Sequence, residues 1–168
     1  MRKKKELKLT IEMVPEPCWE QNLRNFLGMA RWRRIRYDVL YKAGNECQLC
    51  GQTEGMLHTH EIWKYDDLNY VQILIGFIAL CEMCHYIKHI GFANTQVLAG
   101  KLDMEELIKH FCKVNKCKEE TFFKHFEHMV TQNELRKRHS WTTNFVEFLP
   151  KPSTGPKRTV YIKGLPKK

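Results

Sequence analysis

The sequence predicts an α+β fold in which a small module held together by cysteines lies between flanking helices. Two C-x2-C pairs, Cys47/Cys50 and Cys81/Cys84, are separated by 30 residues, which is room for a β-hairpin and its return. Leu57 to Trp63 alternates polar and apolar residues, which is typical of a strand, whereas the segments on both sides of the module have helical periodicity. The length of 168 residues corresponds to one domain with extensions.

The segment before the first cysteine pair is expected to contain an arm followed by helices. Leu7 to Val14 alternates polar and apolar residues and fits either a short strand or an ordered arm. Residues 19–27 and 30–43 have helical composition, Gly28 is the expected break between them, and Gly44 is the expected stop.

The segment after the hairpin is expected to be mainly helical. A helix should open at the second cysteine pair and cover residues 82–90, and residues 104–114 and 121–137 repeat apolar side chains with helical spacing. Residues 141–149 are aromatic and are expected to pack back on the body, whereas residues 158–165 fit a last strand or a loose tail. The chain thus divides into a basic arm with helices (1–45), the cysteine and histidine module (46–95), a helical region (96–149), and a basic tail rich in proline and glycine (150–168).

Charge and composition narrow the class of partner. The chain has 28 Lys and Arg against 19 Asp and Glu, and this net charge of +9 favours polyanions such as nucleic acid. The excess of basic residues lies in the segments before and after the cysteine module, whereas the module itself is acidic. This arrangement suits a cation site with phosphate-binding side chains on both sides of it. The longest apolar run, residues 70–81, is shorter than the roughly 20 residues of a membrane span and is expected to be buried core. No apolar signal-peptide segment follows the basic N-terminus, so we expect a soluble, cytoplasmic protein without a membrane partner.

Four thiolates with this spacing predict a structural zinc site. Zn²⁺ takes four ligands in a tetrahedron, and a C-x2-C turn brings two thiolates to a suitable separation. Gly51, directly after the first pair, permits the turn. Because four sulfurs complete the coordination shell, the ion would be structural and not catalytic. The predicted ligands are Cys47, Cys50, Cys81 and Cys84.

Three histidines are expected to meet at a second cation. His85 and His89 are four residues apart on a predicted helix, so their rings share one face. His60 comes from the strand that the zinc would hold against that helix. Three imidazoles leave coordination positions open, and such an ion can bind a phosphate oxygen and stabilise the charge that develops on it. The histidines nearer the C-terminus are expected to be ordinary helix or surface residues: His110, His125, His128 and His139.

Residues 47–89 resemble the HNH endonucleases, which are ββα-metal nucleases with a treble-clef-like zinc site. The resemblance is carried by C-x2-C-G, by a strand with Leu57, His60 and Ile62, and by L-C-x2-C-H-x3-H starting at Leu80. HEIW stands where the family usually has HHI, as in a similar bacterial and phage subset. The resemblance implies hydrolysis of DNA phosphodiester bonds with a divalent metal, either Mg²⁺, Mn²⁺ or a transition metal that imidazole prefers. It implies that three histidines are metal ligands: His60, His85 and His89. It also implies a catalytic role for these three and for Glu61.

The chain departs from the family pattern at two positions. Glu61 stands where the family has its general-base histidine, and Gly76 stands where it has an asparagine. A carboxylate can take the proton from an attacking water, although glutamate, with an ordinary pKa near 4.3 against 6.5 for histidine, is the weaker base. Alternatively Glu61 holds a metal, orients a water or leaves the site inactive, and His58, on the same strand face as His60, is a second candidate base. Three side chains can replace the missing asparagine, with the amide ranked first: Gln72, Asp66 and Asp67.

Basic clusters on both sides of the module are the predicted phosphate contacts. They are Lys3 to Lys5, Arg31, Arg33, Arg34, Arg36, Lys88, Arg136, Lys137 and Arg138. The sequence therefore predicts a metal-dependent endonuclease or nickase whose partner is DNA. The alternatives are a catalytically inactive HNH-like zinc module that binds nucleic acid or a protein, and an RNase, since the same metal chemistry cleaves RNA.

Overall fold

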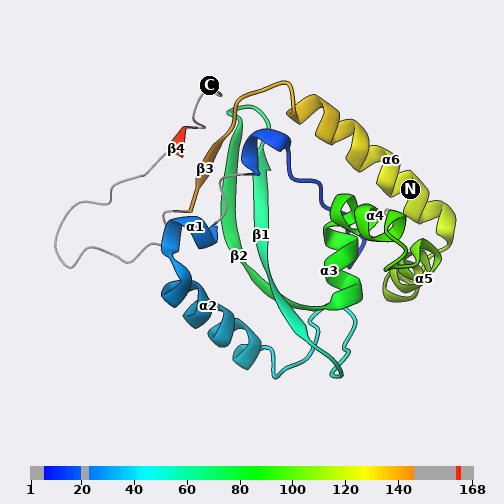
Figure 1. The fold of residues 1–168 in the computed structure, drawn as a ribbon. Coiled ribbons are helices and arrows are strands. Elements are labelled where there is room, and N and C mark those ends of the chain that lie inside the picture. The colour runs from blue at the N-terminus through cyan, green and yellow to red at the C-terminus, as the bar shows by residue number, and fades with distance from the viewer. Residues whose placement is uncertain (1–5, 20–22, 146–161, 164–168) are drawn as a thin grey trace.

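The computed structural model describes residues 6–19, 23–145 and 162–163, and it has the predicted α+β class. A β-hairpin runs through the middle of the molecule, with helices on both sides of it (Figure 1). The elements in chain order are η1 (Glu16–Cys18), α1 (Leu23–Leu27), α2 (Met29–Lys42), β1 (Leu57–Asp66), β2 (Val71–Cys81), α3 (Glu82–Lys88), α4 (Ile90–Leu98), α5 (Met104–Asn115), α6 (Glu119–Arg136), β3 (Thr142–Asn144) and β4 (Ile162–Lys163).

The hairpin and the helix after it form a ββα unit. β1 and β2 are antiparallel, with Leu57 paired to Cys81 at the open end and a bulge between Ile62 and Trp63. Cys81 ends β2 and is also the N-cap of α3, so the chain passes from strand to helix without a loop. The apolar run at residues 70–81 therefore lies mainly in strand β2. β3 pairs with β2 in parallel, and β4 pairs with β3 in turn.

Two hydrophobic clusters hold helices against the hairpin. The larger joins the N-terminal arm, the cysteines, α3 and α5, and it includes the fully buried Leu9, Leu80 and Phe111. The smaller packs Trp32 of α2 against Leu74 of β2 and includes residues of α1. Figure 1 shows α1 and α2 on one side of the hairpin and α3 to α6 on the other. Side chains on β1 and α3 are therefore positioned by packing from both sides.

The helices predicted over residues 30–43, 104–114 and 121–137 are confirmed as α2, α5 and α6. Gly28, the expected break, has a φ of 75°, a conformation that glycine adopts without the steric penalty of a side chain. The helix predicted over residues 19–27 is shorter than expected in the described residues, because α1 begins at Leu23 and η1 precedes it.

The helix expected over residues 82–90 ends early. α3 stops at Lys88, where His89 leaves the helical conformation with φ −105° and ψ 52°. A second helix, α4, then begins at Ile90, and the sequence analysis did not predict it. The turn at His89 changes the direction of the chain directly at one of the predicted metal ligands.

The segment Leu7 to Val14 is an ordered arm and not a strand. The backbone N–H of Leu9 donates to Asn115 Oδ1 (3.0 Å), and Asn115 Nδ2 donates to the Leu9 carbonyl (2.9 Å). The backbone N–H of Ile11 donates to His125 Nε2 (2.9 Å). Side chains of α5 and α6 thus satisfy backbone groups that a neighbouring strand would otherwise bind.

The aromatic segment after α6 packs back on the body as predicted, as far as the structure describes it. Trp141 and Phe145 are each 2% exposed, whereas residues 146–149 and most of the tail lie outside the described residues. In the described ranges, none of the helices combines the length and the apolar character of a bilayer-spanning segment.

Candidate metal centres

Four cysteine sulfurs converge at the open end of the hairpin, as predicted. The two members of the first pair lie in the turns before β1, and those of the second lie at the end of β2 and in the first turn of α3. All four Sγ atoms lie within 4.8 Å of one another, and those of Cys50 and Cys81 are 3.5 Å apart. A zinc tetrahedron with bonds of about 2.3 Å requires sulfurs about 3.8 Å apart, so the set fits a structural Zn²⁺.

The turn of the first pair is fixed by its backbone and by one side-chain amide. The N–H of Gly51, which has a φ of 81°, donates to the Cys47 carbonyl (2.8 Å). Gln48 bonds Ala79 of β2 twice, because its N–H donates to the Ala79 carbonyl (3.0 Å) and its Oε1 accepts from the Ala79 N–H (2.8 Å). The turn is therefore attached to the hairpin even apart from any metal.

Hydrogen bonds within the cluster shift the pKa values of its thiols in opposite directions. Hydrogen bonds from Cys81 and Cys84 lower the pKa of Cys47, and the hydrogen bond to Cys47 raises the pKa of Cys84, to which burial adds. His110 of α5 also contacts the cluster, with its Nε2 3.1 Å from Cys84 Sγ, so it is a helix residue whose ring is hydrogen-bonded. A cation with two positive charges would relieve the repulsion among thiolates, so zinc binding is expected to release protons.

The three predicted histidines also converge. One ring nitrogen from each of His60, His85 and His89 lies within 4.8 Å of the other two. His60 Nδ1 and His89 Nε2 are 3.1 Å apart. Ligand nitrogens about 2.0–2.1 Å from one ion lie about 2.9–3.4 Å apart, so this separation fits a shared cation. The strand and the helix of the ββα unit therefore bring together the side chains whose spacing predicted the site.

A carboxylate from the arm completes the surroundings of His60. Glu12 Oε2 lies 2.9 Å from His60 Nε2, the ring nitrogen that points away from His89. With Nε2–H donating to Glu12, the lone pair of Nδ1 faces the other two imidazoles. A carboxylate that accepts from a ligand histidine in this way fixes its tautomer and ring orientation. The sequence analysis missed Glu12, because no local pattern shows which element the arm lies on.

Lys88 is bound to the same carboxylate. Its Nζ donates to Glu12 Oε1 (2.5 Å) and to Thr10 Oγ1 (2.9 Å), and the Glu12 backbone N–H donates to the Lys88 carbonyl (3.1 Å). Lys88 is only 8% exposed. Lys88, a predicted phosphate contact, is therefore buried, and its ammonium group holds the arm against α3.

Two of the histidines at this site, His85 and His89, are held in the neutral form. Burial lowers the pKa of His85 to about 3, and the neighbouring imidazoles and Arg24 add to the effect. Burial, together with His60, lowers the pKa of His89 to about 4. Neutral imidazole is the form that binds metals, so both rings can act as ligands near neutral pH.

The two candidate bases lie on opposite faces of β1. Glu61 pairs with Phe77 of β2, so strand alternation places it on the face opposite His60, and it is half-buried. His58 lies on the face of His60 and stacks on His85, with ring centroids 4.7 Å apart and planes 7° apart. Burial lowers the pKa of His58, with the Glu82 charge opposing and that of Arg36 adding, so this imidazole can accept a proton.

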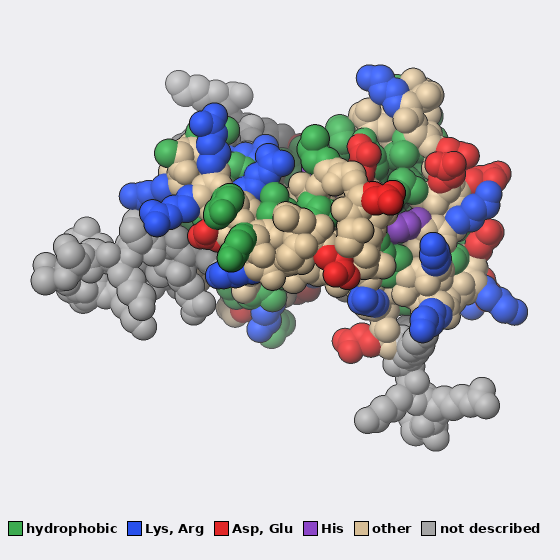
Figure 2. All heavy atoms as spheres, turned by 90° about the horizontal axis from the view of Figure 1, so that it is seen from below, with side chains coloured by type: hydrophobic (Ala, Val, Ile, Leu, Met, Phe, Trp, Pro, Cys, Tyr) green, Lys and Arg blue, Asp and Glu red, His purple; other side chains and the backbone are tan. Residues whose placement is uncertain are grey.

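The predicted phosphate contacts differ in how they are engaged. Arg136 forms a bidentate ion pair with Asp67 (2.7 and 2.8 Å) and Lys137 pairs with Glu134 (2.6 Å), whereas Arg138 is exposed. The arginines of α2 are all exposed. In Figure 2, Lys and Arg side chains lie at both ends of the face shown, and more Asp and Glu side chains accompany them at the end away from α1 and α2. Lys3 to Lys5 lie outside the described residues. The α2 arginines are Arg31, Arg33, Arg34 and Arg36.

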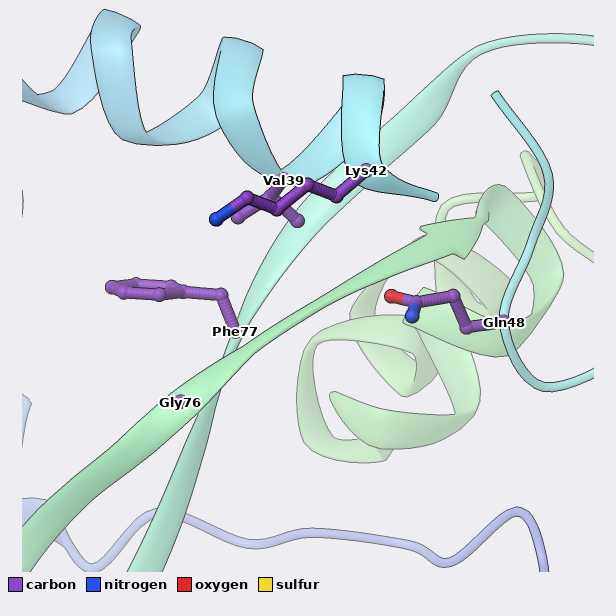
Figure 3. Close-up of a pocket in the computed structure, with 5 residues that line it drawn as sticks. All are labelled: Val39, Lys42, Gln48, Gly76 and Phe77. Atoms are coloured by element: carbon purple, nitrogen blue, oxygen red, sulfur yellow. The ribbon is translucent and has the colours of Figure 1, made fainter. Parts of the chain in front are cut away.

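The position of the missing asparagine opens onto a cavity. Gly76 lines a cavity of about 270 Å³ between α2 and β2, together with Val39, Lys42, Gln48 and Phe77 (Figure 3). None of the three expected substitutes lines this cavity. Gln72 Nε2 donates to Tyr65 Oη and its Oε1 accepts from Thr143, Asp66 accepts from its own turn, and Asp67 binds Arg136. The side-chain amide that joins the first cysteine turn to β2 is that of Gln48.

No protein-family model matches the chain, and neither the curated proteins nor the solved structures contain a match. The geometry of the two centres therefore carries the functional argument.

Proposed function

We propose that the chain is a metal-dependent endonuclease or nickase of the HNH type that hydrolyses phosphodiester bonds in DNA. The observation that carries the proposal is the convergence of three imidazoles from β1 and α3 in a ββα unit whose ends are joined by four cysteines. Two of these imidazoles are neutral near pH 7 because burial lowers their pKa. A divalent cation bound there would supply Lewis-acid stabilisation to a phosphate oxygen.

The remaining chemistry falls to side chains on β1. An attacking water must lose its proton to a base, and His58 and Glu61 are the two candidates. His58 is favoured by its position, because its ring stacks on His85 and lies on the face of the metal ligands. Glu61 adjoins His60 in the chain but faces the other side of the strand. The two bases predict different acid limbs of the pH–rate profile, since glutamate and histidine ordinarily titrate about two pH units apart.

The test is nicking of supercoiled plasmid by the zinc-loaded protein with Mg²⁺, Mn²⁺ or Ni²⁺. We expect cleavage that is lost in His89→Ala and falls by about 10²–10⁴-fold when the base is removed by His58→Ala or Glu61→Gln. His128→Ala, which changes an exposed histidine on α6, is the matched control. Cleavage that survives His89→Ala would refute the metal centre, and salt-sensitive binding without cleavage under any of the three metals would favour the non-catalytic module. Cleavage of RNA but not of DNA would assign an RNase.

A further inference from the structure

The outer face of α2 is basic and is not neutralised by its neighbours. The helix carries five cationic side chains and one carboxylate, Asp38. Within the described residues, no ion pair engages its four arginines, all of which are exposed. The C-terminal cluster differs, because Arg136 and Lys137 are already paired with carboxylates. A polyanion can therefore bind the α2 arginines without breaking an ion pair among the described residues.

Two tyrosines lie among these arginines. The rings of Tyr37 and Tyr41 are stacked, with centroids 6.1 Å apart and planes 12° apart, and the residues are 67% and 73% exposed. Arg33, Tyr37 and Tyr41 follow one another at four-residue intervals, so they line one face of the helix. Trp32 on the opposite face is 5% exposed and makes the contact with the hairpin. The tyrosines are thus not needed to pack α2, and both side chains are mostly exposed to solvent.

The basic and aromatic helix packs against the hairpin that carries part of the histidine centre. Trp32 of α2 meets Phe77 of β2 edge-on, with ring centroids 6.2 Å apart. Phe77 pairs across the hairpin with Glu61, the residue after His60. A strand bound along α2 would therefore lie next to the hairpin whose strand β1 carries His60. α2 has 14 residues and is about 21 Å long, which is enough to hold several nucleotides.

We propose that this face of α2 binds a single-stranded stretch of nucleic acid, with bases stacked on Tyr37 and Tyr41 and phosphates bound by Arg33, Arg34 and Arg36. Aromatic rings of this kind can stack only on bases whose faces are free, which a duplex hides within its own stack. The arginines alone would bind single strands and duplexes alike, because phosphate contacts carry no such selectivity. The proposal rests on the proposed function only for the role of α2 in delivering a strand to the metal centre.

The test measures the binding of fluorescent dT20 and of a 20-base-pair duplex by anisotropy, with zinc-loaded protein and no other divalent ion, so that cleavage does not interfere. Tyr37→Ala/Tyr41→Ala should weaken dT20 binding by about 5- to 150-fold for each base that loses its stacking partner. Tyr37→Phe/Tyr41→Phe should bind within about twofold of the wild type, because stacking needs only the ring. Phe123→Ala, an exposed aromatic residue on α6, is the matched control.

The arginines are tested through the salt dependence. Each lost phosphate contact on a single strand removes about 0.7 from the slope of log K against log salt, so Arg33→Gln/Arg34→Gln/Arg36→Gln should flatten it by about 2. Lys109→Gln/Lys124→Gln, on α5 and α6, should leave the slope unchanged. The proposal is overturned if the alanine pair binds dT20 as tightly as the wild type, or if it loses dT20 and duplex equally. A nuclease-inactive protein that still passes these tests would refute the proposed function and leave this surface in place.

Discussion

Glu12 provides the sharpest test of how the histidine centre is built. Glu12→Gln keeps the size of the side chain but removes the charge that accepts from His60 Nε2 at 2.9 Å. Losing such a partner of a ligand histidine costs about 10–100-fold in metal affinity, or about 1.4–2.7 kcal/mol. The Glu12 side chain is 29% exposed, so water can partly replace the lost acceptor. We therefore expect a loss near the lower end, about tenfold.

The measurement is a calorimetric titration of Ni²⁺ into protein whose cysteine centre has first been filled with one equivalent of Zn²⁺. Ni²⁺ suits imidazole ligands and gives a measurable heat at a three-histidine site. Glu106→Gln, which neutralises an exposed carboxylate in the first turn of α5, controls for the change in net charge. Wild-type affinity in Glu12→Gln, or an equal loss in Glu106→Gln, would show that Glu12 does not orient His60.

Three further predictions concern stability. Cys81→Ser should abolish binding of the tightly held zinc, and the variant should no longer unfold cooperatively, because zinc binding is part of the folding free energy. Metal analysis and circular dichroism check this prediction. A variant that is folded but free of zinc would contradict it. Asn115→Ala should cost about 2–4 kcal/mol in urea unfolding, because it leaves the N–H and carbonyl of Leu9 unpaired, and an unchanged midpoint would disprove the role of this amide. The hydrogen bond from Arg136 lowers the pKa of Asp67 in the folded protein. This pair therefore stabilises the fold at pH values above the ordinary pKa of aspartate, about 3.9, and the stabilisation is lost as the pH falls through the pKa of the folded state. Asp67→Asn should therefore cost up to about 1 kcal/mol at pH 7, and its difference from the wild type should narrow below about pH 4; a constant difference would show that the carboxylate charge is irrelevant.

The parts of the site that depend on local spacing could be predicted from the sequence. The i, i+4 spacing of His85 and His89 and the two cysteine turns each fix geometry within a few residues, so their convergence followed once the hairpin was assumed. The alternation around His60 also predicted which face of β1 it shares with His58. These relations hold in any chain that folds as a hairpin followed by a helix.

The contacts that join distant parts of the chain could not be predicted in this way. Glu12 reaches His60 across 48 residues, and nothing in the arm sequence indicates its path. A lysine is expected at the surface, yet Lys88 is buried because the carboxylate of Glu12 compensates its charge. The helix α4 was missed because the chain turns at His89, a residue type that does not by itself mark a helix end, and because Gly91 lies inside α4. In each case tertiary contacts decide the outcome against the local pattern.

The route of the arm also links the histidine centre to helices that are made much later in the chain. Leu9 and Ile11 bind Asn115 and His125, which lie 106 and 114 positions further along. The bond between Lys88 and Glu12 needs only the chain as far as α3, whereas the backbone bonds of the arm need the end of α5 and the beginning of α6. A nascent chain that already carries all three imidazoles could therefore hold Glu12 through Lys88, but the backbone of its arm would stay unanchored until those two helices have been made.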